Sequence, residues 1–156
     1  MSPDDKEVWV TTKHDGGVSI IDVATQKVSQ TLDLKTKVPL RLQFTPDGKR
    51  VVIVNEFDGK VLVLDAVTRK EIKRITVVKQ TQDFSVVNDN TAVLNGVPII
   101  PKTLLNELLI SPDGSHAYVD VMGSNRIDVI DLKALEVTGS ISTGAVPKGM
   151  AWAVRR

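Results

Sequence analysis

Three stretches of 34 residues follow one pattern of residue types: SPDDKEVWVTTKHDGGVSIIDVATQKVSQTLDLK from Ser2, TPDGKRVVIVNEFDGKVLVLDAVTRKEIKRITVV from Thr45, and SPDGSHAYVDVMGSNRIDVIDLKALEVTGSISTG from Ser111. The three align without insertion or deletion. Such self-similarity marks a repeat protein, in which each copy forms one supersecondary unit and neighbouring copies stack. The repeats therefore determine the architecture, whereas the residues that they share say little about chemistry.

Each copy predicts three strands joined by tight turns. It opens with Ser or Thr, then Pro and Asp, and in two copies Gly, a series that suits a type I turn. Asp5 stands where Gly is expected in the first copy, and Asp tolerates turn conformations. Apolar segments separated by Gly- or Asn-bearing loops then predict a meander. The predicted strands are 8–11, 18–21 and 27–32, then 51–55, 61–64 and 71–77, then 117–121, 127–130 and 136–141.

A fourth strand is predicted before the second and third copies, at residues 39–44 and 105–110, and residues 147–152 repeat its pattern at the end. The second strand of each copy is apolar at most positions, so both faces of its sheet must be covered. Four antiparallel strands about every 40 residues is the period of a β-propeller blade, whose neighbours cover both of its faces. We predict an all-β fold of about three four-stranded blades in circularly permuted order, forming one domain over residues 1–156.

The repeat resembles a known family, the YVTN-type propeller repeats of surface-layer proteins, lactonase-like proteins and the propeller portions of some cofactor-dependent oxidoreductases. The motifs that carry the likeness are S-P-D-G, the strand Val52-Ile53-Val54-Asn55, and Asp65-Ala66-Val67-Thr68. They cover nearly the whole chain except about residues 79–103. The resemblance implies a β-propeller fold, ligand binding at one rim and in the channel, and a periplasmic or extracellular setting, although the chain carries no signal peptide. The matched residues are those that build blades, so we expect a noncatalytic binding scaffold. A lactonase-like or quinone- or redox-associated propeller enzyme is the alternative.

The order of the strands leaves an unmatched strand at each end. The first meander has no inner strand before it, and the last inner strand has no meander after it. Three blades are too few for a ring of the usual 4 to 8, and an open ring would expose strand edges and apolar faces. We expect a homodimer of six blades, in which the strand from Lys148 to Ala153 completes the partner's first blade beside Glu7–Thr12. A C-terminal fragment of a larger propeller remains the second possibility.

Residues 79–103 interrupt the repeat. The second copy follows the first by 43 residues and the third follows the second by 66, so about 23 residues are extra. Residues 83–87 and 91–96 predict two strands joined by a turn, and two prolines in 97–101 then break the pattern. The segment is either an irregular insertion or a decayed half-blade. Two roles are open for the segment: it only packs against the blades, or it forms a functional lid or interface.

Composition excludes several classes of function. The net charge is +1, with 20 basic and 19 acidic residues scattered along the chain, so nucleic acid is not an expected partner. There is no cysteine, which excludes disulfides, thiolate metal sites and a cysteine nucleophile. No apolar run approaches the roughly 18 residues that span a bilayer. We predict no membrane span, metal site or cofactor.

Candidate ligand-binding residues are polar side chains at one rim and along the channel. The repeated Asp22, Asp65 and Asp131 precede tight turns, so we interpret them as turn caps. His116 follows a Pro-Asp-Gly turn on the opposite rim and is interpreted as a solvated residue. No catalytic set of side chains is predicted. The candidate ligand-binding residues are His14, Asp15, Arg41, Glu56, Asp58, Glu107, Asn125 and Lys148.

Overall fold

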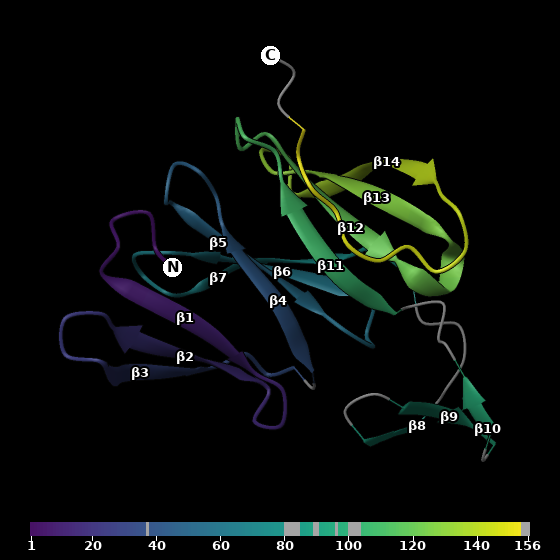
Figure 1. Ribbon diagram of the computed structural model, residues 1–156, viewed down its shortest axis with the longest axis horizontal. Coiled ribbons are helices and arrows are strands. Elements are labelled where there is room, and N and C mark those ends of the chain that lie inside the picture. The colour runs from purple at the N-terminus through teal and green to yellow at the C-terminus, as the bar shows by residue number, and fades with distance from the viewer. Residues whose placement is uncertain (37, 80–84, 89–90, 96, 100–103, 154–156) are drawn as a thin grey trace.

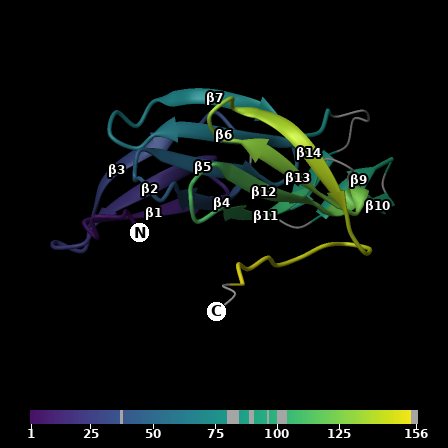
Figure 2. The same ribbon diagram turned by 90° about the horizontal axis from the view of Figure 1, so that it is seen from above.

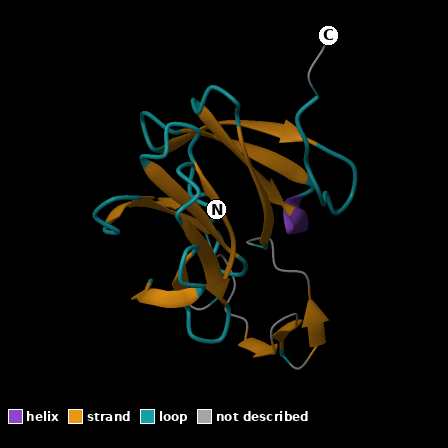
Figure 3. Ribbon diagram, turned by 60° about the vertical axis from the view of Figure 1, so that its left-hand side comes forward, coloured by secondary structure: helices purple, strands orange, loops and turns teal. Residues whose placement is uncertain are grey.

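The computed structural model describes residues 1–36, 38–79, 85–88, 91–95, 97–99 and 104–153. These residues form four antiparallel sheets, each built in chain order (Figure 1). One turn of 3-10 helix, η1 (Met122–Ser124), follows β12 (Figure 3). No helix in the described part of the chain has the length and apolar character needed to cross a bilayer. The strands are β1 (Glu7–Thr12), β2 (Gly17–Asp22), β3 (Lys27–Asp33), β4 (Pro39–Phe44), β5 (Arg50–Asn55), β6 (Lys60–Asp65), β7 (Glu71–Thr76), β8 (Ser85–Asn88), β9 (Thr91–Leu94), β10 (Val97–Ile99), β11 (Leu105–Ile110), β12 (His116–Val121), β13 (Arg126–Asp131) and β14 (Glu136–Ser142).

Three of the sheets are propeller blades, as the sequence predicts. Blade 1 contains β1 to β3, blade 2 contains β4 to β7, and blade 3 contains β11 to β14. Figure 2 shows β1 and the inner strands β4 and β11 on one side of the molecule and the outer strands β3, β7 and β14 on the other. Blade 1 therefore lacks the innermost strand that the other two blades have, because β1 pairs only with β2 among the described residues.

The predicted Pro-Asp turns are confirmed. The fourth residue of each turn donates its backbone N–H to the carbonyl of the first, at 2.8 to 3.0 Å. That fourth residue is Gly48 in blade 2 and Gly114 in blade 3, both with positive φ. Asp5 adopts the same left-handed conformation, φ 59°, in the first copy. A short polar side chain tolerates this region better than most residues do, which explains how the turn survives without glycine.

One half of the core lies between blades 1 and 2. Trp9, Val18 and Ile20 of blade 1 pack against blade 2, whose contributions to this core are Val51, Ile53, Leu62 and Leu64. All of them are at most 4% exposed. Alternate residues of a strand point to opposite faces of its sheet, so the remaining apolar positions of β5 and β6 face the other way.

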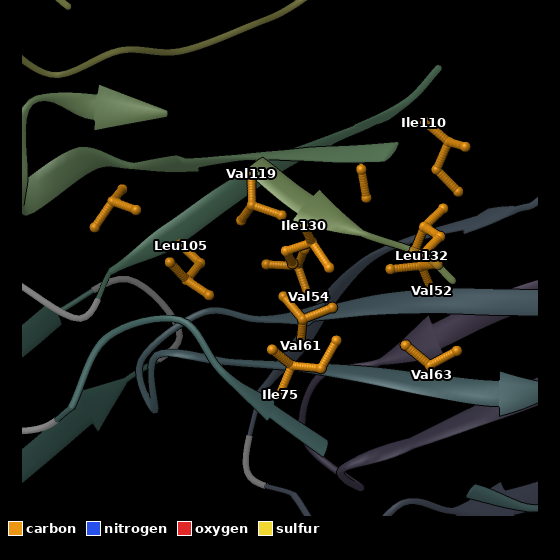
Figure 4. Packing of buried hydrophobic residues seen from close by; sticks show 12 residues of the cluster. Val52, Val54, Val61, Val63, Ile75, Leu105, Ile110, Val119, Ile130 and Leu132 are labelled. Atoms are coloured by element: carbon orange, nitrogen blue, oxygen red, sulfur yellow. The ribbon is translucent and has the colours of Figure 1, made fainter. Parts of the chain in front are cut away.

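The other half of the core lies between blades 2 and 3. Val52, Val54, Val61, Val63 and Ile75 of blade 2 meet blade 3 across this interface (Figure 4). The contributions of blade 3 are Leu105, Ile110, Ala117, Val119, Val121, Ile130 and Leu132. Blade 2 is thus covered on both faces, which explains its nearly continuous apolar strands.

Two blade faces have no blade against them in the described structure. We call the face that a blade turns toward the next copy its leading face, and the opposite face its trailing face. The leading face of blade 3 includes Tyr118, Ile127, Val129 and Ile141, and the side chain of Ile141 is 49% exposed. The equivalent residues of blade 2 are Val52, Val61, Val63 and Ile75, which are at most 4% exposed. The trailing face of blade 1 is open too, and Val10 on that face is 42% exposed.

The insertion forms a small sheet of its own, with strand order β10-β9-β8. Strands β8 and β9 lie where the sequence predicts two strands, whereas β10 is a third strand that the sequence analysis did not predict. Pro98 lies in β10, at the edge of this sheet, where a missing N–H interrupts no central ladder. Residues 80–84, 89–90, 96 and 100–103 of the insertion lie outside the described residues. Whether the segment is an insertion or a decayed half-blade stays a prediction.

The predicted C-terminal strand is not a strand in the single chain. Residues 145–153 follow β14 and pair with no sheet. Figure 2 shows them running on the same side of the molecule as β1, β4 and β11.

Candidate functional site

The three blades place their connections on two rims. The turn rim carries the Pro-Asp turns at residues 2–5, 45–48 and 111–114, and the loop rim carries the connections at 13–16, 56–59 and 122–125. This arrangement follows from the alternating direction of antiparallel strands. The inner strands β4 and β11 start at the loop rim and end at the turn rim.

Arg41 and Glu107 link the inner strands of blades 2 and 3. The Arg41 guanidinium lies 3.0 Å from Oε1 of Glu107, and its Nε donates a hydrogen bond of 3.1 Å to the same oxygen. The two residues occupy equivalent positions of β4 and β11, next to the bulge in each strand. The structure thus brings these two predicted site residues together. Because Arg41 is 48% exposed, the pair contributes only about 0.2–1 kcal/mol of stability.

Glu56 and Asp58 lie in the loop between β5 and β6, where Glu56 pairs with another blade and Asp58 holds its own loop. The Glu56 carboxylate lies 2.8 Å from the Lys13 ammonium of blade 1, with little exposure of the glutamate. Asp58 Oδ1 accepts the N–H of Lys60 at 3.0 Å. Burial raises the pKa of Asp58, and its hydrogen bond and the nearby Lys60 and Arg74 charges oppose that rise.

The other predicted residues of the loop rim are spread along it. His14 and Asp15 are exposed in the loop between β1 and β2. Asn125 adopts the left-handed conformation after η1, and its Oδ1 accepts the N–H of Val146 at 3.0 Å, which places it in a structural role. Lys148 is exposed in the C-terminal segment. No group of three or more His, Cys, Asp or Glu side chains able to hold a metal ion occurs within the described ranges.

Asp120 is the polar residue that the sequence analysis missed. It is fully buried in β12, and its Oδ1 accepts the N–H groups of Asn106 and Glu107, both at 2.7 Å. These N–H groups belong to the bulge of β11, so the carboxylate takes the place of a strand partner. Burial raises its pKa, opposed by the two backbone hydrogen bonds. The sequence did contain one indication of this role, because Asp120 stands at the position that Thr11 and Val54 occupy in the other copies.

The repeated aspartates are turn caps, as predicted. Asp22 Oδ1 accepts the N–H and the hydroxyl of Thr25, both at 2.7 Å, and Asp65 binds Thr68 in the same way. Asp131 accepts two backbone N–H groups instead, because Ala134 has no hydroxyl to donate. Their pKa values are lowered mainly by these hydrogen bonds. Such groups hold turns together and are not poised for proton transfer near neutral pH.

A prediction follows for the turn at Ser111. The Ser111 hydroxyl donates to Asp113 at 2.6 Å and is the main reason why the pKa of Asp113 falls to about 2. Ser111→Ala should return this pKa toward its ordinary value of 3.8, measured by following the carboxyl carbon in an NMR titration. A lowered pKa stabilises the fold above the ordinary value, and that stabilisation is lost as the pH falls toward 2. The stability advantage of the natural protein over the variant should therefore shrink between pH 4 and pH 2.

The matched control is Thr45→Ala, because Thr45 donates to Asp47 in the equivalent turn of blade 2 at 2.6 Å. This change should leave the titration of Asp113 where it is. An Asp113 pKa that stays near 2 in Ser111→Ala would show that the backbone N–H of Ser115, and not the hydroxyl, sets it.

Two pockets open on the turn rim, one at each junction between blades. The pocket between blades 2 and 3 has a volume of about 430 Å³, and the pocket between blades 1 and 2 one of about 550 Å³. Both are lined by turn residues, including Asp47, Arg50 and Asp113 in the first and Glu7, Asp47 and Arg69 in the second. The carboxylates of Asp47 and Asp113 serve the turns, and Glu7 pairs with Arg69.

Solved structures confirm the propeller architecture. The chain is similar to Kuenenia stuttgartiensis hydrazine synthase, with 29% identity and a TM-score of 0.72 over 93% of this chain. It also superposes on the WD40 repeats of RRP9, with 12% identity and a TM-score of 0.68 over 91% of this chain. The second likeness shows the fold alone. The chain spans 35% and 37% of the lengths of these two structures. No curated protein matches the sequence.

One family model, described as the cytochrome D1 heme domain, matches residues 1–89. That description implies a heme, so the pockets must be tested for a fit. An axial ligand to heme iron comes from His, Cys, Met or Tyr. Neither pocket is lined by any of these residue types, and the chain has no cysteine. His14 and His116 lie on opposite rims, and Nδ1 of His116 is 2.7 Å from the Ser115 hydroxyl. Heme therefore fits neither pocket.

The match extends over the first meander, all of blade 2 and the beginning of the insertion. It agrees with the propeller neighbours on the fold and covers more than half of the chain. The chain belongs to the cytochrome D1 heme domain family of β-propellers.

Proposed function

We propose that this protein is a β-propeller binding scaffold of the YVTN type, noncatalytic by itself, which closes its ring by associating with a second copy. The observation that carries the proposal is the contrast between covered and open blade faces. Blade 2 buries both faces, whereas the leading face of blade 3 and the trailing face of blade 1 lie open among the described residues. Contiguous exposed apolar surface of this kind is typical of interaction sites.

The two open faces correspond to the two faces that pack together at each junction inside the chain. A leading face packs against a trailing face at both junctions that the structure contains. The leading face of blade 3 can therefore receive the trailing face of blade 1 from a second copy. A two-fold axis generates the same junction twice, and the result is a ring of six blades, within the usual range of 4 to 8.

The binding role is supported by how the candidate residues are used. Arg41 with Glu107 and Glu56 with Lys13 form ion pairs between blades, while Asn125 and Asp58 hold loops. His14, Asp15 and Lys148 are exposed to solvent, and we infer that they contribute to contacts with a ligand or partner. Loops carried on a rigid scaffold are the usual place for binding residues.

Size-exclusion chromatography with light scattering tests the association. We expect a mass of twice the 17.0 kDa chain at micromolar concentration. A monomer at tens of micromolar contradicts the closed ring of two copies, and is the result that a piece of a longer propeller with further blades would give.

A redox-associated propeller is the second candidate, because the chain belongs to a family whose description names a heme and resembles a hydrazine synthase. Titration with hemin, followed by its Soret band, separates the two. The scaffold predicts no saturable shift of the band. A shift that saturates at a fixed ratio of hemin to chain favours the redox candidate, and His14→Ala and His116→Ala would then identify the ligand.

A further inference from the structure

The C-terminal segment occupies the position of an inner strand in the blade that would follow blade 3. Residues 147–152 repeat the spacing of β4, with Pro147 at the position of Pro39 and Trp152 at that of Phe44. Figure 2 shows the segment on the side of the molecule that carries the inner strands. It runs from the loop rim toward the turn rim (Figure 1), which is the direction of β4 and β11.

The contact that Trp152 makes is the same as the contact that Phe44 makes. Phe44 of blade 2 packs edge to face on Trp9 of blade 1, with ring centroids 5.4 Å apart and an angle of 74° between the rings. Trp152 packs on Tyr118 of blade 3, also at 5.4 Å and with an angle of 79°. Tyr118 is the residue of blade 3 equivalent to Trp9. The indole N–H of Trp152 also donates to the carbonyl of Ile110 at 2.8 Å.

The backbone leading to the segment follows the path that leaves the other blades. After blade 2, Val77 donates its N–H to the carbonyl of Gly59, and after blade 3, Thr143 donates to the carbonyl of Asn125, both at 2.9 Å. The two bonds join equivalent residues. The C-terminal segment therefore follows the same path as the connection and inner strand between two blades. It pairs with no sheet of its own chain among the described residues.

We infer that residues 147–152 add to β1 of a second copy of this chain as its innermost strand, with Trp152 opposite Val8 and Met150 opposite Val10. This inference rests on the proposed function, because it names how the ring closes. The register is taken from blade 2, where Phe44 lies opposite Val51 and Leu42 opposite Ile53. Val51 and Ile53 are the residues equivalent to Val8 and Val10.

The second copy is the occupant that these observations favour. Strand β1 is equivalent to β5 and β12, and its edge corresponds to the edges on which those strands pair with β4 and β11. Extended segments add readily to such an edge. Val10 beside that edge is 42% exposed, and Trp152 is 44% exposed. When the segment of one copy pairs with β1 of the other, the exposed parts of Val10 and Trp152 are covered. Trp152 keeps its contact with Tyr118 of the same chain.

Cysteine pairs test the register, since the chain has no cysteine of its own. Val10→Cys combined with Met150→Cys should give a covalent dimer on mild oxidation, because directly opposed residues of an antiparallel pair lie close enough for a disulfide. The matched control combines Val10→Cys with Lys148→Cys, which lies two residues before Met150 in the segment and outside the register proposed for Val10. It should give at least tenfold less covalent dimer.

The outcomes separate this inference from the proposed function. Equal crosslinking of both pairs, or a light-scattering dimer in which neither pair crosslinks, overturns the strand exchange and leaves self-association standing. A monomer of the unmodified protein overturns both.

Trp152 variants provide a second measurement. Trp152→Ala should raise the dimer dissociation constant at least tenfold, and Trp152→Phe, which copies Phe44, should change it less than threefold. Far-UV circular dichroism shows whether each variant stays folded. An unchanged dissociation constant in Trp152→Ala contradicts the role given to this segment.

Discussion

Leu62→Ala should lower the free energy of unfolding by about 2–5 kcal/mol, as expected for truncating a buried leucine. Leu62 lies in β6 of blade 2, and its side chain has no exposure to solvent. It packs with Trp9 and Val18 of blade 1 in the core between the two blades. The lost stability has two parts: the free energy of burying the removed atoms, and the cost of the cavity that they leave between the two sheets.

Urea unfolding followed by fluorescence and circular dichroism measures the effect. A typical domain is stable by about 5–15 kcal/mol, so the variant should unfold at a much lower urea concentration with an unchanged slope. The matched control is Val67→Ala, because Val67 is 84% exposed at the turn after β6. Its effect should stay within about 0.5 kcal/mol. A loss below 1 kcal/mol for Leu62→Ala would mean that the junction between blades 1 and 2 is looser than the structure shows.

The repetition in the sequence was enough to predict the blades. Contacts that are local or repeated determine the Pro-Asp turns, the apolar second strands and the aspartate caps. Each copy of the repeat therefore predicts the same structure. The unmatched inner strand was predicted for the same reason. Its observed position, against Tyr118 without a sheet partner, depends on a neighbouring blade that the described residues do not include.

The candidate site was harder to predict, because its contacts join different blades. The sequence indicated that Arg41 and Glu107 face the channel, but only the stacking of blades 2 and 3 shows that they pair with each other. Glu56 was predicted as a rim ligand, whereas the structure pairs it with Lys13 of blade 1. Asp120 was missed because a single polar residue in an apolar strand gives no periodic signal.

Asp120→Ala should destabilise the protein by about 2–5 kcal/mol, since it leaves the N–H groups of Asn106 and Glu107 buried without an acceptor. Asp120→Asn keeps an oxygen at the position of Oδ1 and should retain most of the stability. The matched control is Thr11→Ala at the equivalent position of blade 1, where the hydroxyl makes one hydrogen bond, to the carbonyl of Leu40. Its cost should be about 0.5–1.5 kcal/mol. Urea unfolding at pH 7 compares the three variants.

The pH dependence of the same variants separates the acceptor from the charge. Burial raises the pKa of Asp120, so its contribution to stability is largest below the ordinary aspartate pKa and declines as the pH rises through the raised value. Asp120→Asn does not titrate, and its stability relative to the natural protein should therefore improve between pH 4 and pH 7. A relative stability that falls over this range would mean that the folded protein favours the charged carboxylate.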